Sequence, residues 1–270
     1  MLPARAVPPS AWNKTVNYLR QVFAVAETDV RKLRHDPAEL LTRMVQPMLW
    51  LLIFGEVFTR AHVIPTGSMS YLDFITPGIL AQSVLFVAIF YGISVIWERD
   101  LGILHKMLVS PTPRSALVLG RALSSGVRGL SQGVVVYAIA AMLGVHLSVS
   151  FGSVLGVIVA VMVSAAIFST FSLIAACIVK TRERFMGIGQ VLTMPLFFAS
   201  NAIYPIDMMP AWLRYVARVN PLSYEVDALR TLMISGGTSL YGLTFDFAFL
   251  IISMIVLTVI AAIVYPSIAR

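Results

Sequence analysis

The chain has 270 residues, of which 58% are hydrophobic and only 12% are charged. A mean hydropathy of +0.85 would leave a soluble domain with a very large exposed apolar surface, so this composition excludes a soluble protein and indicates one that crosses a membrane repeatedly. The net charge of +7 is explained by cationic loops that face anionic lipid headgroups, and it gives no argument for a nucleic-acid partner.

The N-terminal region is predicted to lie outside the membrane core. Residues 1–40 form a tail followed by a stretch in which apolar residues return at helical spacing, among them Trp12, Leu19, Phe23 and Val30. This pattern predicts an amphipathic helix that lies along the inner membrane surface. The alternative is that the same face packs against a soluble partner.

Residues 41–270 are predicted to form one transmembrane domain. A membrane-spanning helix needs about 20 mostly apolar residues. Six runs meet this requirement, at residues 41–59, 74–97, 117–143, 154–178, 185–203 and 245–265. Because the number of spans is even, both termini are expected on the same side of the membrane.

The distribution of cations predicts which side that is. Of the 20 Lys and Arg residues, 15 lie before or at the very start of the first span, in or next to the loops between spans two and three and between spans four and five, or in the C-terminal tail. Cationic residues are retained on the cytoplasmic side of a membrane. The N terminus, the C terminus and the loop between the second and third spans are therefore predicted to be cytoplasmic.

That loop keeps a helical pattern of its own over residues 98–110, which we call the coupling segment. Its leucines fall on one face, its charged residues lie elsewhere around the helix, and Pro111 prevents continuation. The pattern predicts a short amphipathic helix at the membrane surface, through which a cytoplasmic partner could move the two flanking spans. The candidate coupling residues are Glu98, Arg99, Leu101, Gly102, Leu104, Met107 and Leu108.

The third span carries a polar strip that must face protein or water. It includes Arg128, for which a position at the centre of a membrane would cost about 2.5–3.5 kcal/mol. Two interpretations stay open: Arg128 lines a substrate path, or its side chain reaches back to the inner phosphates. The candidate path residues are Arg128, Gln132, Asn201 and Tyr204.

After the fifth span, residues 210–235 are too polar to cross the membrane but still show helical patterns. One amphipathic piece contains Trp212, which is expected to face inward. A second begins with Asn220 as the cap and Pro221 at the first helical position, and it includes Arg230. Both are predicted to enter the bilayer partway from the outer side, which is possible only where protein or a cavity surrounds them.

The predicted fold class is therefore an all-α polytopic membrane protein. It has six transmembrane helices, an N-terminal interfacial amphipathic helix, a cytoplasmic coupling helix and two extracellular re-entrant half-helices. The chain offers no phosphate loop, no grouped metal ligands and a single cysteine, and no carboxylate is expected near the middle of a span. The sequence thus predicts a protein that is not catalytic, binds no metal or cofactor itself, and takes any energy for uphill transport from another chain.

Several motifs, in order along the chain, resemble the permease subunits of type-two ABC exporters, in the branch that includes daunorubicin-resistance and nodulation-factor export. The matching stretches are residues 98–102 (ERDLG), 110–114 (SPTPR), 202–205 (AIYP), 210–213 (PAWL) and 220–224 (NPLSY). The resemblance covers nearly the whole chain from Trp12 onward.

The resemblance implies one half of a dimeric channel in the bacterial plasma membrane, with a second permease copy and a separate ABC-type ATPase that docks on the coupling segment. ATP and Mg would be bound by that ATPase. The expected activity is export of an amphipathic molecule, such as a drug, a lipid or a lipid-linked saccharide. An ion-coupled carrier or channel, or a membrane-embedded lipid-modifying enzyme, is the alternative, and whether the permease partner is identical stays open.

Overall fold

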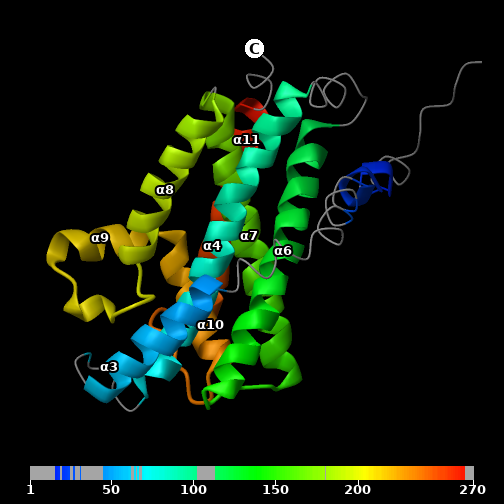
Figure 1. Ribbon diagram of the computed structural model, residues 1–270. Coiled ribbons are helices and arrows are strands. Elements are labelled where there is room, and N and C mark those ends of the chain that lie inside the picture. The colour runs from blue at the N-terminus through cyan, green and yellow to red at the C-terminus, as the bar shows by residue number, and fades with distance from the viewer. Residues whose placement is uncertain are drawn as a thin grey trace, which may run out of the picture.

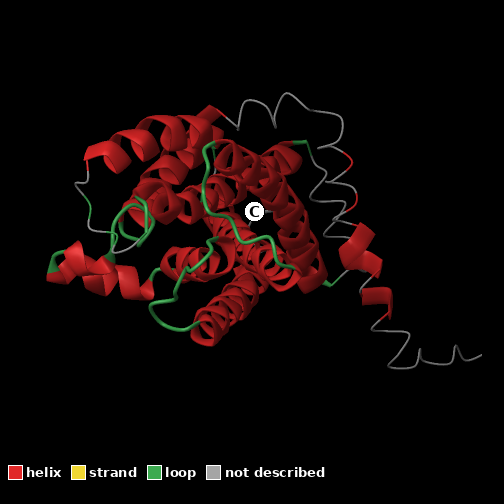
Figure 2. Cartoon of the chain, turned by 90° about the horizontal axis from the view of Figure 1, so that it is seen from below, coloured by secondary structure: helices red, strands yellow, loops and turns green. Residues whose placement is uncertain are grey.

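The computed structural model describes residues 16–18, 20–24, 27, 31, 45–61, 64, 66, 69–101, 113–179 and 181–264. These residues form helices joined by loops, and the view from below in Figure 2 shows the helices packed side by side without a strand. The protein is an all-α polytopic membrane protein, as the sequence predicts. A single antiparallel bridge joins Leu147 to Ile234 within the described part of the chain.

Long helices run in the same general direction through the bundle (Figure 1). They are α4 (Tyr71–Asp100), α6 (Arg114–Met142), α7 (Phe151–Ile178), α8 (Arg182–Phe198) and α11 (Leu243–Val264). Of the described helices, α4, α7 and α11 are long and apolar enough to cross a membrane. Helix α6 is as long but carries the polar strip, and α8 has only 17 residues. These bounds follow the predicted spans closely, and the six-span topology stays a prediction.

The first predicted span is described from Val45. The chain is helical from there, passes through a π-helical turn, η1 (Trp50–Gly55), and ends in α3 (Glu56–Ala61). Trp50 stacks on Phe54 with ring centroids 4.4 Å apart and meets the edge of Phe197 on α8 at 5.7 Å. Aromatic packing thus fixes this segment against the bundle.

Helix α7 forms the centre of the bundle because α4, α6, α10 and α11 all pack against it. It contains no charged residue, and its buried side includes the small residues Ala160, Ser164 and Ala165. Small side chains let neighbouring helices approach closely, which is how helices associate within a membrane.

We name the two ends of the bundle for reference. The loop end is where α4 ends at Asp100 and α6 begins, at the top of Figure 1. The cap end is the opposite one, where α3 and the turn between α6 and α7 lie. The coupling segment leaves α4 at the loop end.

Two short helices follow α8, as the sequence predicts: α9 (Ala211–Val219) and α10 (Pro221–Met233). Asn220 caps α10 through its side-chain oxygen, which accepts a hydrogen bond from the Leu222 amide at 3.0 Å. Its side-chain nitrogen donates to the carbonyl oxygens of Leu196 at 2.7 Å and Ala199 at 3.0 Å. This residue therefore satisfies the ends of two helices at once, and α8 ends at Phe198 rather than at the predicted residue 203.

The environments of α9 and α10 are opposite. Helix α10 packs against α4, α7 and α11, and residues 222–230 are all buried. On α9, Trp212 is 68% exposed, so the prediction that its side chain faces inward is wrong for a single copy of the chain, and Val216 on the same helix is 43% exposed. Helical periodicity identified the apolar face of α9 but could not show what lies against it.

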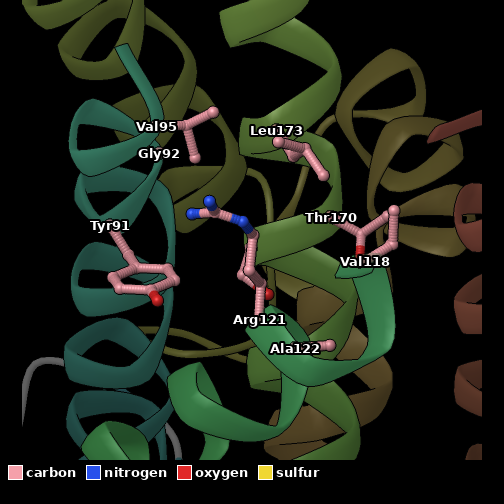
Figure 3. A pocket seen from close by; sticks show the side chains of 9 residues that line it. Tyr91, Gly92, Val95, Val118, Arg121, Ala122, Thr170 and Leu173 are labelled. Carbon is pink, nitrogen blue, oxygen red and sulfur yellow. The ribbon is translucent and has the colours of Figure 1, made fainter. Parts of the chain in front are cut away.

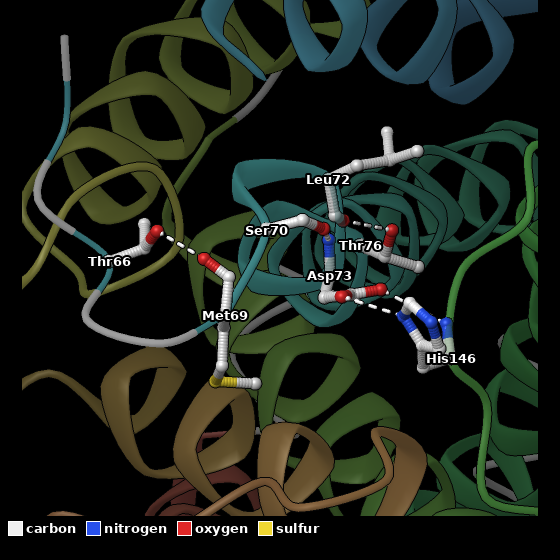
Figure 4. Close-up of polar contacts among 7 residues, drawn as sticks. All are labelled: Thr66, Met69, Ser70, Leu72, Asp73, Thr76 and His146. Carbon is white, nitrogen blue, oxygen red and sulfur yellow. Dashed lines mark hydrogen bonds and ion pairs between the residues drawn. The ribbon is translucent and has the colours of Figure 1, made fainter. Parts of the chain in front are cut away.

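A polar cluster fixes the start of α4 at the cap end (Figure 4). The Ser70 hydroxyl caps the helix by accepting a hydrogen bond from the Asp73 amide at 3.0 Å. The Asp73 carboxylate accepts the His146 amide at 3.0 Å and lies 3.1 Å from the His146 imidazole. Next to it, the Ser148 amide donates to the Met233 carbonyl, so the turn between α6 and α7 joins the start of α4 to the end of α10.

Gly78 allows the loop after α8 to lie directly on α4. A Cβ atom added there would come within 2.8 Å of the Ala202 Cα atom, whereas one added at Gly152 on α7 would meet nothing within 4 Å. We expect Gly78→Ala to lower stability by about 1–3 kcal/mol, because backbone atoms must shift. Gly152→Ala should be neutral or stabilising. Thermal unfolding midpoints in detergent would check this, and equal midpoints would contradict the contact.

Candidate coupling site at the loop end

A buried ion pair joins the helices on either side of the coupling segment. The Glu98 carboxylate, in the last turn of α4, binds the Arg121 guanidinium of α6, and both side chains are less than a tenth exposed. Figure 3 shows Arg121 reaching from α6 toward Tyr91 and Val95 of α4. Because separating buried charges is costly, the pair fixes α4 to α6 at this end of the bundle.

A second, exposed set of contacts joins α4 to α8. Asp100 lies 3.1 Å from Arg182, at the start of α8, and 3.1 Å from its neighbour Arg99. The Arg182 guanidinium also stacks over the Trp97 ring, 4.0 Å from its centroid. Exposed ion pairs contribute little to stability, but the stacked cation orients the start of α8 against the end of α4.

The N-terminal helix reaches the same end of the bundle. The Tyr18 hydroxyl donates a hydrogen bond to the Ser115 hydroxyl, in the first turn of α6, at 3.1 Å. Of the predicted interface-helix residues, Phe23 is 61% exposed, while Trp12, Leu19 and Val30 lie outside the described residues. The described contact thus joins the predicted interfacial helix to the first turn of α6.

The predicted coupling residues divide into two groups. Glu98 and Arg99 belong to the last turn of α4 rather than to a separate helix, and Leu101 follows it in a turn, 67% exposed. Gly102, Leu104, Met107 and Leu108 lie outside the described residues. Because Glu98 is buried, it is not available to a soluble partner in this conformation, and its carboxylate binds Arg121 instead.

The polar strip of α6 faces the protein interior, which is one of the two environments that the sequence allows. Ser124, Ser125 and Gln132 are buried, and the Arg128 guanidinium lies over the Tyr91 ring of α4, 5.1 Å from its centroid. Arg128 is half-buried and lies within the bundle at a helix–helix contact. Neither interpretation of its role is tested by this position.

The other two candidate path residues lie at a different place from Arg128. The Asn201 carbonyl accepts a hydrogen bond from Arg230 of α10 at 2.8 Å. Tyr204 lines an apolar pocket of about 470 Å³ between α8 and α9, together with Trp212 and Phe198. Burial raises the pKa of Tyr204, so its phenol stays protonated and donates to the Phe198 carbonyl. The structure therefore does not bring the four path candidates together.

The sequence analysis missed one buried ionisable group. Glu225 on α10 is fully buried and lies beside Ser164, which is midway along α7. The expectation that no carboxylate approaches the middle of a span is therefore wrong. The sequence could not show this because Glu225 belongs to a half-length helix, whose depth depends on how the chain folds back between α4, α7 and α11.

No set of three His, Cys, Asp or Glu side chains within the described ranges could hold a metal ion. Cys177 is half-buried near the end of α7.

Comparison with known proteins identifies a family. The model of the family described as "ABC-2 type transporter" matches residues 20–234. The chain is 28% identical to the Ycf38 protein of Cyanophora paradoxa, described as a transport permease, over 80% of this chain and 74% of that protein. It is 28% identical to the daunorubicin resistance ABC transporter permease protein DrrB1 of Streptomyces coeruleorubidus, over 86% and 77%. Nodulation protein J of Rhizobium leguminosarum bv. trifolii is 25% identical, over 73% and 74%.

The Glu98–Arg121 pair makes a testable contribution to stability. Glu98→Gln or Arg121→Gln leaves one buried charge behind, so each should cost about 3–5 kcal/mol and lower the thermal midpoint in detergent. The double variant should cost less than the sum of the two, because no lone charge remains. Arg182→Gln, which removes an exposed pair, is the matched control and should change the midpoint little. Strict additivity of the two buried changes would contradict the pair.

Proposed function

Because the chain belongs to the ABC-2 type transporter family, we propose that it is the permease subunit of an ATP-driven exporter, in which the coupling segment passes movement from an ATPase to the membrane helices. The family makes the chain a multi-pass membrane transport permease that is not catalytic by itself. ABC-2 permeases generally work with an ABC ATPase subunit. What we add is the ATP-driven direction of transport, the coupling residues and the class of cargo.

The observation that carries the proposal is the buried Glu98–Arg121 pair. It joins the helices on both sides of the coupling segment, so a force applied to that segment acts on α4 and α6 as a unit. Arg182 extends the unit to α8 through Asp100 and the Trp97 ring. An ATPase that pushes on exposed Leu101 and the residues after it would thus move three helices together.

The assembly we propose contains two copies of this chain and two ATPase subunits, with ATP and Mg bound by the ATPases. The N-terminal helix would brace the same surface, which the Tyr18–Ser115 hydrogen bond supports. In keeping with the distribution of cations, the loop end and both termini would face the cytoplasm of a bacterial plasma membrane and the cap end would face outward.

The proposed cargo is an amphipathic molecule, such as a drug, a lipid or a lipid-linked saccharide. Two relatives carry names that refer to daunorubicin resistance and to nodulation. The pocket between α8 and α9 is lined mainly by apolar side chains and opens beside the exposed Trp212, which suits an apolar chain better than a free ion.

Buried Glu225 supports one rival function, an ion-coupled carrier, because such carriers place an ionisable group within the membrane. The two functions differ in what powers them. Purified chain in sealed vesicles would move cargo uphill alone if it were a carrier, and only with an ATPase subunit and ATP if it is a permease of the proposed kind.

The coupling segment provides the test of the proposal. A photocrosslinker in place of Lys106 should capture the co-expressed ATPase. Leu101→Ala combined with Leu104→Ala should lower ATP-driven export at least about tenfold, the loss that corresponds to 1.4 kcal/mol of coupling free energy. Membrane insertion should stay normal. As the matched control, Leu240→Ala removes an exposed leucine in the loop between α10 and α11 and should leave export unchanged. Full export by the double variant would refute the coupling role.

A further inference from the structure

Helix α10 brings a carboxyl group into the protein interior without a charge to balance it. Glu225 has 0% of its surface exposed, and among the described residues no ion pair and no hydrogen bond of ordinary geometry reaches its carboxyl oxygens, although the neutral Ser164 hydroxyl lies close enough to interact with them. The side chain faces Ser164 of α7, which is itself fully buried. Since α7 contains no charged residue, nothing on that helix can neutralise a carboxylate.

The other charged groups around α10 are in contact with groups other than Glu225. Arg230 donates to the carbonyl oxygens of Asn201 at 2.8 Å and Phe74 at 3.3 Å, and its guanidinium lies over the Phe74 ring. On α4, Asp73 is bound to His146. An ionised carboxylate in the interior without a partner costs many kcal/mol, so Glu225 must be protonated in this conformation.

A second carboxyl group in contact with α10 must also carry a proton, for an independent reason. The Ser239 hydroxyl oxygen lies 2.9 Å from an Asp227 carboxyl oxygen and 3.0 Å from an Asp246 carboxyl oxygen, and it accepts the Gly242 amide at 2.6 Å. A serine hydroxyl has one proton and can donate it to only one of the two carboxyl groups. The other carboxyl group holds its contact only if it carries a proton and donates to Ser239.

The backbone identifies which carboxyl group that is. The same Asp227 oxygen also accepts the amides of Leu240 at 2.8 Å and Tyr241 at 3.1 Å, an arrangement that favours the ionised form. Asp246, in the first turn of α11, is as buried as Asp227 but accepts no backbone amide among the described contacts, so it is the carboxyl group that carries the proton.

The described groups that face Asp246 would not neutralise its carboxylate if the proton were lost. They are Asp227, which repels a second negative charge, and the phenols of Tyr224 and Tyr241. Arg218 of α9 acts on the two phenols. Helix α10 is thus seated between α4, α7 and α11 with two neutral acids at its contacts.

We propose that α10 is a proton-controlled plug, held among α4, α7 and α11 while Glu225 and Asp246 carry protons and released from them when both ionise. The seated state binds more protons than the released one, so acidic solution at the cap end stabilises seating and rising pH weakens it. This inference concerns the conformation of the chain and does not rest on ATP-driven export.

Accessibility of a buried position on α10 tests the proposal in the full chain in native membranes. The single native cysteine is removed by Cys177→Ser, and Ser223→Cys is the reporter, because Ser223 is fully buried and its hydroxyl makes no hydrogen bond within the described structure. A membrane-impermeant maleimide is added from the cap-end side. The labelling ratio is the rate of maleimide labelling at Ser223→Cys divided by the rate at exposed Ser235→Cys. This division cancels the pH dependence of thiol reactivity, which is common to both variants.

The labelling ratio should rise with pH, by up to about tenfold per pH unit for each proton released. Glu225→Gln and Asp246→Asn mimic the protonated acids, so each should flatten the rise and the two together should abolish it. Glu56→Gln changes a carboxylate outside the plug, at the start of α3, and should leave the rise intact. A ratio that stays constant with pH in the parent, or a rise that persists in the double variant, would overturn the proposal.

Discussion

The organisation of the loop end depends on one buried ion pair between residues that are 23 positions apart in the sequence. Two charges in a low-dielectric interior stabilise the fold only while they remain in contact, since either one alone would be left without solvation. The Glu98–Arg121 pair therefore restricts α4 and α6 to movements that keep these two side chains together. Helix α8 is joined to the same unit by weaker, exposed contacts, which can be remade at little cost. The end of the bundle is thus stiff between α4 and α6 and more adaptable toward α8.

The half of the bundle that includes the cap end meets a different requirement, because the short helices α9 and α10 end within or beside the apolar bundle. Each helix end exposes backbone groups that lipid cannot satisfy. Asn220 meets part of this need by capping α10 and binding two carbonyl oxygens at the end of α8. Arg230 does the same for the carbonyls of Phe74 and Asn201. A buried cation is therefore retained at this end mainly as a donor to the backbone, with its charge placed over an aromatic ring.

Local patterns predicted what depends on neighbouring residues in the chain. Hydropathy located α4, α7 and α11, and the Asn220–Pro221 pair located the start of α10. Contacts between distant segments could not be predicted in this way. The partner of Glu98, the depth of Glu225 and the early end of α8 all depend on how helices pack, and periodicity carries no information about that. The exposed face of α9 shows the same limit, since an amphipathic pattern does not identify what covers the apolar side.

Helix α4 connects the two ends. Its 30 residues span about 45 Å at the rise of an α-helix, and Asp73 near the cap end and Glu98 at the loop end are about 38 Å apart along it. At one end it is bound to Arg121, and at the other its Phe74 carbonyl accepts Arg230 of α10. Buried polar contacts thus hold α4 at both ends. Because Pro77 interrupts the helix between them, movement that begins beside the coupling segment either reaches α10 through Phe74 or is taken up by bending at Pro77.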